Sequence, residues 1–186
     1  MGAAGPPAAP HLTVVPPVAQ PQVTASQLRD VMARFATGVT VLTVGGEYMH
    51  GMTANAFSSV SLTPPLVLAC VVRTARIHDA ILRGGHFGVS VLGAEQEGVG
   101  RYFADKKRPD GVAGFQSVDY FTGRHTGVPL LTGSLGWLEC ELAASYDGGD
   151  HSIFVGTVLD AGSRSGPALL FFDGSFQQGL PPARSA

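Results

Sequence analysis

The stretch that decides the fold reads GMTANAFSSVSLTPP and covers residues 51–65. It consists mainly of small and hydroxyl-bearing residues, and it contains Asn55, the single asparagine of the chain. Such a run adds little to a hydrophobic core, but it can present backbone N–H groups and short side-chain donors to a flat polar ligand. The apolar run LVLACVV, residues 66–72, follows directly and is typical of a fully buried strand. A strand edge beside a core strand, with no ligand, is the alternative interpretation.

The pattern around this stretch predicts a mainly β chain with a few short helices. Thr24 and Gln27 fit a capping box at the start of an amphipathic helix, for which Gly38 is a plausible C-terminal cap. Residues 104–134 are irregular and Gly-rich, and a loop of this length is usually functional or mobile. The remaining expected elements are strands at 39–44, from 48, 86–92, 137–146, 152–161 and 168–172, and helices at 76–83 and 95–103.

About seven strands separated by turns predict a β-barrel. The chain has 186 residues, of which 45% are hydrophobic, and this suffices for one domain with a sizeable core. We expect this domain at residues 24–180. The Ala/Pro-rich segment 1–23 and the segment 181–186 are expected to be disordered tails.

Composition and motifs exclude several kinds of partner. The formal net charge of −2 gives no basic face for nucleic acid, and no apolar run approaches the ~20 residues that span a bilayer. No signal peptide is apparent, and Cys70 and Cys140 are expected to be reduced thiols of the core, so we expect a cytoplasmic protein. No metal-ligand spacing, GxGxxG motif or Walker-type loop is present, which predicts neither a metal site nor a Rossmann unit.

Residues 51–65 resemble the signature of the short-chain flavin reductases, the reductase components of two-component flavin monooxygenases. Segments on both sides are similar to this family as well, and the likeness extends over residues 26–178. The segments that carry it are 28–43, GSLGWLEC at 133–140 and GGDH at 148–151.

This resemblance implies an FMN-binding split β-barrel, Greek-key-like, that forms a homodimer with flavin at the subunit interface. It implies hydride transfer from NADH or NADPH to N5 of FMN or FAD. Reduced flavin would then reach a partner monooxygenase by diffusion.

The resemblance also implies which residues bind the flavin. Thr53, Ala54 and Asn55 would lie along the isoalloxazine edge, and Ser58 and Ser59 would contact the pyrimidine end or the ribityl chain. The full set expected to bind cofactor is Thr53, Ala54, Asn55, Ser58, Ser59, Cys70, Val71, Arg73, Thr74, Arg76, His78 and Phe103.

The segment RTARIH, residues 73–78, would bind the flavin phosphate, because its two arginines follow a strand and open a helix. The family commonly has a serine-rich loop here, whereas this chain has Ala75, Arg76 and Ile77 in the middle. A solvated basic turn is therefore the alternative. Ser175 stands where relatives have Arg or Lys, so a cation that could assist phosphate binding is missing.

His151 is the predicted catalytic residue, because the resemblance places it beside the nicotinamide. A purely structural role for this histidine is the alternative. We assign no role to His11, His50, His86 and His125. Two further functions stay open: a flavoprotein that keeps its flavin bound and acts on an organic substrate, and a flavin-binding protein without catalytic activity.

Overall fold

The structure is a computed structural model that describes residues 23–179. The two predicted tails lie outside these residues, except for Val23. The chain divides into two compact units, 1–32 and 33–186. Among the described residues, no helix is both long enough and apolar enough to cross a membrane.

The first unit contains helix α1, Ala25–Met32. Its predicted capping box is confirmed, because the Thr24 N–H donates to Gln27 Oε1 at 2.8 Å and the Gln27 N–H donates to Thr24 Oγ1 at 3.2 Å. The helix stops at Met32, so Gly38 is not its cap. Gly38 instead lies in strand β1, where it pairs with Leu170, and this pairing requires an extended backbone.

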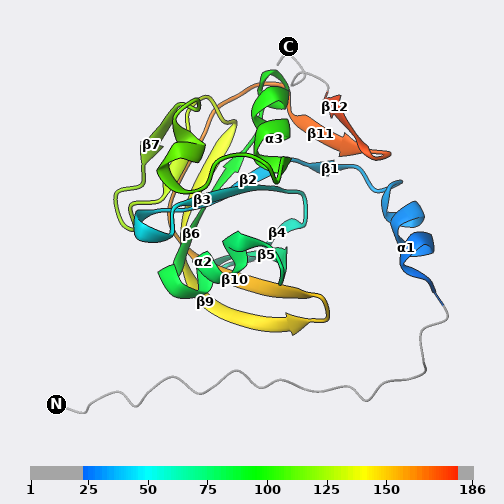
Figure 1. Cartoon of the computed structure of the whole chain (residues 1–186), viewed down its shortest axis with the longest axis horizontal. Coiled ribbons are helices and arrows are strands. Elements are labelled where there is room, and N and C mark those ends of the chain that lie inside the picture. The colour runs from blue at the N-terminus through cyan, green and yellow to red at the C-terminus, as the bar shows by residue number, and fades with distance from the viewer. Residues whose placement is uncertain (1–22, 180–186) are drawn as a thin grey trace. The chain divides into compact units, whose positions relative to one another are not determined.

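The described part of the second unit forms a seven-stranded antiparallel sheet in the order β3-β2-β6-β9-β10-β5-β4 (Figure 1). Strand β2 is formed by the β-branched run predicted at 39–44, and residues 45–49 lead from it into β3. The bounds are β2 Thr40–Val44, β3 His50–Ala54, β4 Phe57–Leu62, β5 Pro65–Val72, β6 His86–Val91, β9 Gly136–Gly148 and β10 His151–Ser163.

Two smaller sheets and several short helices complete the described part of this unit. Helix α2, Arg76–Gly84, was predicted at 76–83. It buries Ile77, Ala80 and Ile81, and is capped by Gly85 in the left-handed conformation with a φ of 69°. The other elements are β1 Thr37–Gly38, β11 Leu169–Phe172, β12 Ser175–Gln178, β7 Tyr120–Thr122, β8 Pro129–Leu131, α3 Glu97–Ala104, and the 3₁₀ helices η1 Gly46–Tyr48, η2 Ala94–Gln96 and η3 Gly111–Phe115.

The segment 104–134 is less irregular than its composition predicts. It contains η3, β7 and β8, and Phe115, Val128, Leu130 and Leu131 are almost fully buried. Phe115 packs on Phe103 with ring centroids 5.2 Å apart. Strands of three residues leave too short a pattern to be seen in sequence, and their burial depends on partners far along the chain. Much of this predicted loop therefore belongs to the core.

The apolar run 66–72 is buried on one face only, so the prediction of a fully buried strand was wrong. Val67, Ala69 and Val71 point into the core, whereas the alternate residues of β5 are half-buried. Both cysteines are unpaired, but only Cys140 is fully buried, and Cys70 is half-buried. Burial raises the pKa of the Cys140 thiol to about 12, so it stays protonated.

Candidate functional site

The stretch 51–65 covers most of β3, the break at 55–56, strand β4, the turn at 63–64 and the first residue of β5. Asn55 and Ala56 interrupt the strands, and both are exposed. The Thr53 hydroxyl donates a hydrogen bond to the Gly100 carbonyl at 2.7 Å, which ties β3 to helix α3. The stretch is thus part of the sheet, and its exposed break is the place where polar groups become available to a ligand.

A pocket of about 430 Å³ opens beside β3, at the ends of β5 and α3. Four residues of the predicted site line it, namely Thr53, Thr74, Arg76 and Phe103. The remaining lining residues were not predicted as binding residues, and several of them carry charge. They are His50, Met52, Val72, Ala75, Ala104, Lys106, Arg108 and Asp110.

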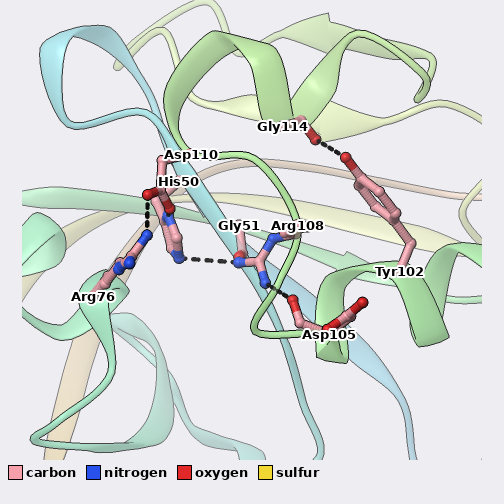
Figure 2. A network of polar contacts seen from close by, with 8 residues as sticks. All are labelled: His50, Gly51, Arg76, Tyr102, Asp105, Arg108, Asp110 and Gly114. Carbon is pink, nitrogen blue, oxygen red and sulfur yellow. Dashed lines mark hydrogen bonds and ion pairs between the residues drawn. The ribbon is translucent and has the colours of Figure 1, made fainter.

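Polar contacts join the strand, the helix and the loop around this pocket (Figure 2). Arg76 forms an ion pair with Asp110, whose other carboxylate oxygen lies 4.0 Å from Nδ1 of His50. Arg108 donates from Nη2 to the Gly51 carbonyl and to Nε2 of His50, the latter at 2.9 Å. Its Nη1 donates to the carbonyl of Asp105 at 2.8 Å. The loop after α3 is therefore anchored to the first two residues of β3.

The charges of this network favour an anionic ligand. Burial, followed by the charge of Arg108, lowers the pKa of His50 to about 4, so this imidazole is neutral near pH 7. A neutral His50 accepts from Arg108 through Nε2 and carries its proton on Nδ1, toward Asp110. Three cationic side chains, those of Arg76, Lys106 and Arg108, line the pocket together with one carboxylate, that of Asp110. Cations exceed carboxylates among the residues that line this pocket.

A second pocket, of about 180 Å³, lies on the other side of Thr53. Thr53 and Ala104 line both pockets, so the two spaces are neighbours. Its other lining residues are mainly apolar or aromatic: Val39, Ala54, Asn55, Phe171 and Phe176. An apolar space with one amide, next to a cationic pocket, suits a ligand that has a flat ring at one end and phosphate at the other.

Two residues of the predicted phosphate loop turn away from these pockets. Arg73 donates from Nε to the Gly149 carbonyl at 3.1 Å and pairs through Nη2 with Asp147 at 2.9 Å. His78 is buried, and its Nε2 lies 2.9 Å from Ser152 Oγ. Neither residue lines the pockets described above.

The other predicted residues lie on β4, β5 and β10. Ser58 and Ser59 are exposed on the edge strand β4, whereas Val71 belongs to the core and Cys70 is half-buried. His151 begins β10, with its Nδ1 2.7 Å from Asp150 Oδ1 and its side chain 42% exposed. In the sheet, His151 is opposite Val72, a residue of the larger pocket. The hairpin that carries His151 thus runs along the strand that ends at this pocket.

Sequence reasoning missed His50, Lys106, Arg108 and Asp110. One signal was available for the loop residues, because the cationic run KKR at 106–108 begins three positions after the predicted Phe103. No comparable signal marks His50, whose partners come from a loop about 60 positions later in the chain.

Residues 32–180 match the family described as the flavin reductase like domain, so the chain belongs to this family. The match covers the described part of the second unit and agrees with the resemblance seen in residues 26–178.

Among curated proteins, the chain is 49% identical over 160 residues to an NADH-dependent FAD reductase of Streptomyces globisporus, covering 84% of this chain and 87% of that protein. It is 42% identical over 162 residues to an NADH-dependent flavin reductase of a Rhodococcus species, covering 84% and 88%.

Among solved structures, the flavin reductase component of a bacterial two-component tryptophan halogenase is similar with a TM-score of 0.81 and 47% identity, covering 85% of this chain and 99% of that one. The NADH:FAD oxidoreductase of Streptomyces globisporus C-1027, in complex with NAD and FAD fragments, has a TM-score of 0.79 and 46% identity, covering 85% and 94%. The predicted fold, a mainly β split barrel with short helices, is confirmed.

Proposed function

We propose that this protein uses NADH to reduce FMN or FAD and releases the reduced flavin to a partner monooxygenase. The observation that carries the proposal is the pair of neighbouring pockets on β3, one apolar and one cationic. Relatives named NADH-dependent FAD reductase and FMN reductase (NADH) support the choice of donor and leave both flavins as candidates.

The pocket residues fit a flavin. Thr53, Ala54 and Asn55 border the smaller pocket and would hold the ring system, with the Asn55 amide as a hydrogen-bonding group. Arg76, Lys106 and Arg108 would hold the phosphate and compensate for the cation that is missing at Ser175. A bound flavin supplies the hydride-accepting ring, which the protein itself lacks.

We assign His151 to the nicotinamide side of the site. Its ring is close to the carboxylate of Asp150 and is partly exposed, so it can hydrogen-bond a carboxamide that approaches from solvent. Ser58 and Ser59 are proposed to contact the ribityl chain from the exposed edge of β4.

We further propose a cytoplasmic homodimer. Leu62 and Val60 on the edge strand β4 are 90% and 49% exposed, and the outward face of β5 is apolar and half-buried. An apolar surface along an open sheet edge favours burial against a second copy. The unpaired Cys70 and Cys140 fit a reducing compartment.

Anaerobic stopped-flow absorbance tests the proposed activity. The purified protein is mixed with FMN or FAD and then with NADH or NADPH. We expect the band of oxidised flavin to bleach with a rate that saturates in NADH. A flavin that binds but keeps its oxidised spectrum with both nucleotides would contradict reductase activity and favour a flavin-binding protein without this reaction.

A further inference from the structure

The tip of the β9–β10 hairpin is attached to the first residue of the predicted phosphate loop. Arg73 makes three contacts there: its backbone N–H donates to the Asp150 carbonyl at 3.0 Å, its Nε to the Gly149 carbonyl at 3.1 Å, and its Nη2 lies 2.9 Å from Asp147 Oδ1. The planar guanidinium thus uses two of its nitrogens on one turn, which fixes orientation better than a single contact does.

The turn also forms a hydrogen bond to the carboxylate that Arg73 contacts. Gly149 has a φ of 78°, and its N–H donates to Asp147 Oδ1 at 2.9 Å. The hydrogen bonds from Gly149 and Arg73 lower the pKa of Asp147, which keeps the carboxylate ionised. The turn and the guanidinium therefore share one carboxylate oxygen.

A second contact holds the same hairpin from the other end of the loop. His78 is in α2, and its ring lies 2.9 Å from the Ser152 hydroxyl and 5.3 Å from the Phe154 ring, centroid to centroid. His151 is the residue between the Arg73 contacts and the His78 contact. Its backbone is thus held from both sides by the segment 73–78.

We propose that Arg73 is a positioning residue, which holds the hairpin tip and thereby His151 in place for the nicotinamide, and that it is not a ligand of the flavin phosphate. This inference rests on the proposed function. Arg73 and Asp147 have side chains that are 44% and 80% exposed, so their pairing is screened by solvent, and we expect its loss to change the orientation of the hairpin tip and not the stability of the fold.

Arg73→Ala and Asp147→Asn separate the two roles, because the two residues contact each other and Asp147 cannot bind phosphate. We expect each variant to raise KM for NADH, or to slow flavin reduction, about fivefold through loss of orientation. The double variant should be no worse than Arg73→Ala alone, because Arg73→Ala already removes the contact with Asp147. Arg76→Ala serves as the matched reference for a cation that lines the pocket.

Flavin affinity gives the decisive contrast. Fluorescence titration with FMN and with riboflavin, which lacks the phosphate, should yield the same ratio of dissociation constants for Arg73→Ala as for the unmodified protein. A selective loss of FMN affinity in Arg73→Ala, with normal behaviour of Asp147→Asn, would overturn the proposal and make Arg73 a phosphate ligand. Unchanged kinetics in both variants would overturn it as well.

Hydrogen exchange provides a readout that does not depend on activity. Amides of residues 148–152 should exchange faster in Arg73→Ala and in Asp147→Asn, whereas those of β3 should not change. If the unmodified protein binds no flavin or reduces none, the proposed function fails, but exchange still reports the attachment of the hairpin. Unchanged exchange at the hairpin tip would overturn the attachment itself.

Discussion

Arg73 and Arg76 are three positions apart, and their side chains serve different regions of the molecule. Arg73 follows β5 and contacts the β9–β10 hairpin, whereas Arg76 opens α2 and pairs with Asp110 at the rim of the larger pocket. Two guanidiniums in one short segment suggest a shared phosphate site. Their partners instead separate them: Arg73 contacts the hairpin, and Arg76 lines the larger pocket.

The two regions also differ in burial. On the hairpin side, Arg73 and Asp147 are exposed, Arg73 in the turn after β5 and Asp147 near the end of β9. On the pocket side, the side chain of His50 is only 14% exposed. Arg108 is half-buried, with its Cζ 5.6 Å from the centroid of the Phe103 ring. Changes on the pocket side should therefore affect both stability and ligand binding, and changes on the hairpin side mainly orientation.

The largest effect is expected for Gly51→Ala, which alters only the pocket side. A Cβ at Gly51 would lie 2.5 Å from Cε1 of Phe103 and 3.1 Å from Cζ of Phe115, two rings that are almost fully buried. Overpacking of this kind costs about 3 kcal/mol. Thermal unfolding should show a lower Tm, and FMN titration a weaker affinity. Gly38→Ala is the control, because nothing lies within 4 Å of its Cβ position.

As the pH falls, we expect the folded protein to lose stability first through His50 on the pocket side, and only at lower pH through Asp147 on the hairpin side. The pKa of His50 is about 4 in the folded protein against an ordinary 6.5, so between these values the unfolded chain binds a proton that the folded protein does not. Stability therefore falls as the pH falls from 6.5 to about 4, by up to about 3 kcal/mol.

His50→Gln removes this titrating group and keeps an acceptor for Arg108. Urea unfolding at a series of pH values should show a flatter profile for His50→Gln than for the unmodified protein. Equal slopes in this window would contradict the assignment. The depressed pKa of Asp147 acts only at lower pH, because this carboxylate stays ionised below its ordinary value of 3.8.

Arg76→Ala should weaken FMN binding about tenfold, the equivalent of roughly 1.4 kcal/mol, and leave riboflavin binding nearly unchanged. The reason is that Arg76 lines the cationic pocket with Lys106 and Arg108. Titrations at increasing NaCl concentration should show a smaller salt dependence for the variant. An equal loss for both flavins would point to a disturbed α2 and not to a lost phosphate contact.

The smallest effect is expected for Asp110→Asn. Its carboxylate is paired with Arg76, so it competes with a ligand phosphate for the same guanidinium. An exposed ion pair contributes at most about 1 kcal/mol, so FMN should bind up to about fivefold more tightly in the variant. Asp173→Asn, which removes the exposed pair with Arg34, is the control that should leave FMN affinity unchanged. Weaker FMN binding in Asp110→Asn would contradict competition.

Several elements could be predicted from local pattern, while others could not. The capping box at Thr24, the apolar face of α2 and the turn between β9 and β10 each depend on residues that are close in sequence. Gly38 lies in β1, which pairs with β11 far along the chain, and local pattern does not specify such a partner. Strands β7 and β8 pair with each other, but with three residues each they are too short to leave a pattern.

The candidate site shows the same division. Thr53, Arg76 and Phe103 were predicted from motif position and line the larger pocket, but His50, Arg108 and Asp110 were not. Arg108 reaches the Gly51 carbonyl from a loop that carries its own anchoring contacts to Asp105. Such a contact combines two segments, neither of which indicates a site by itself.

By itself, the sequence determined the family, the mainly β class and several of the segments that line the two pockets, because these are encoded in short motifs and in the alternation of apolar residues. Only the tertiary structure decided what each charged side chain contacts. Long flexible side chains such as Arg73 and Arg76 can reach in several directions from one short segment. The strand register, which places His151 opposite Val72, brings the hairpin to Arg73, while the loop after α3 brings Asp110 to Arg76.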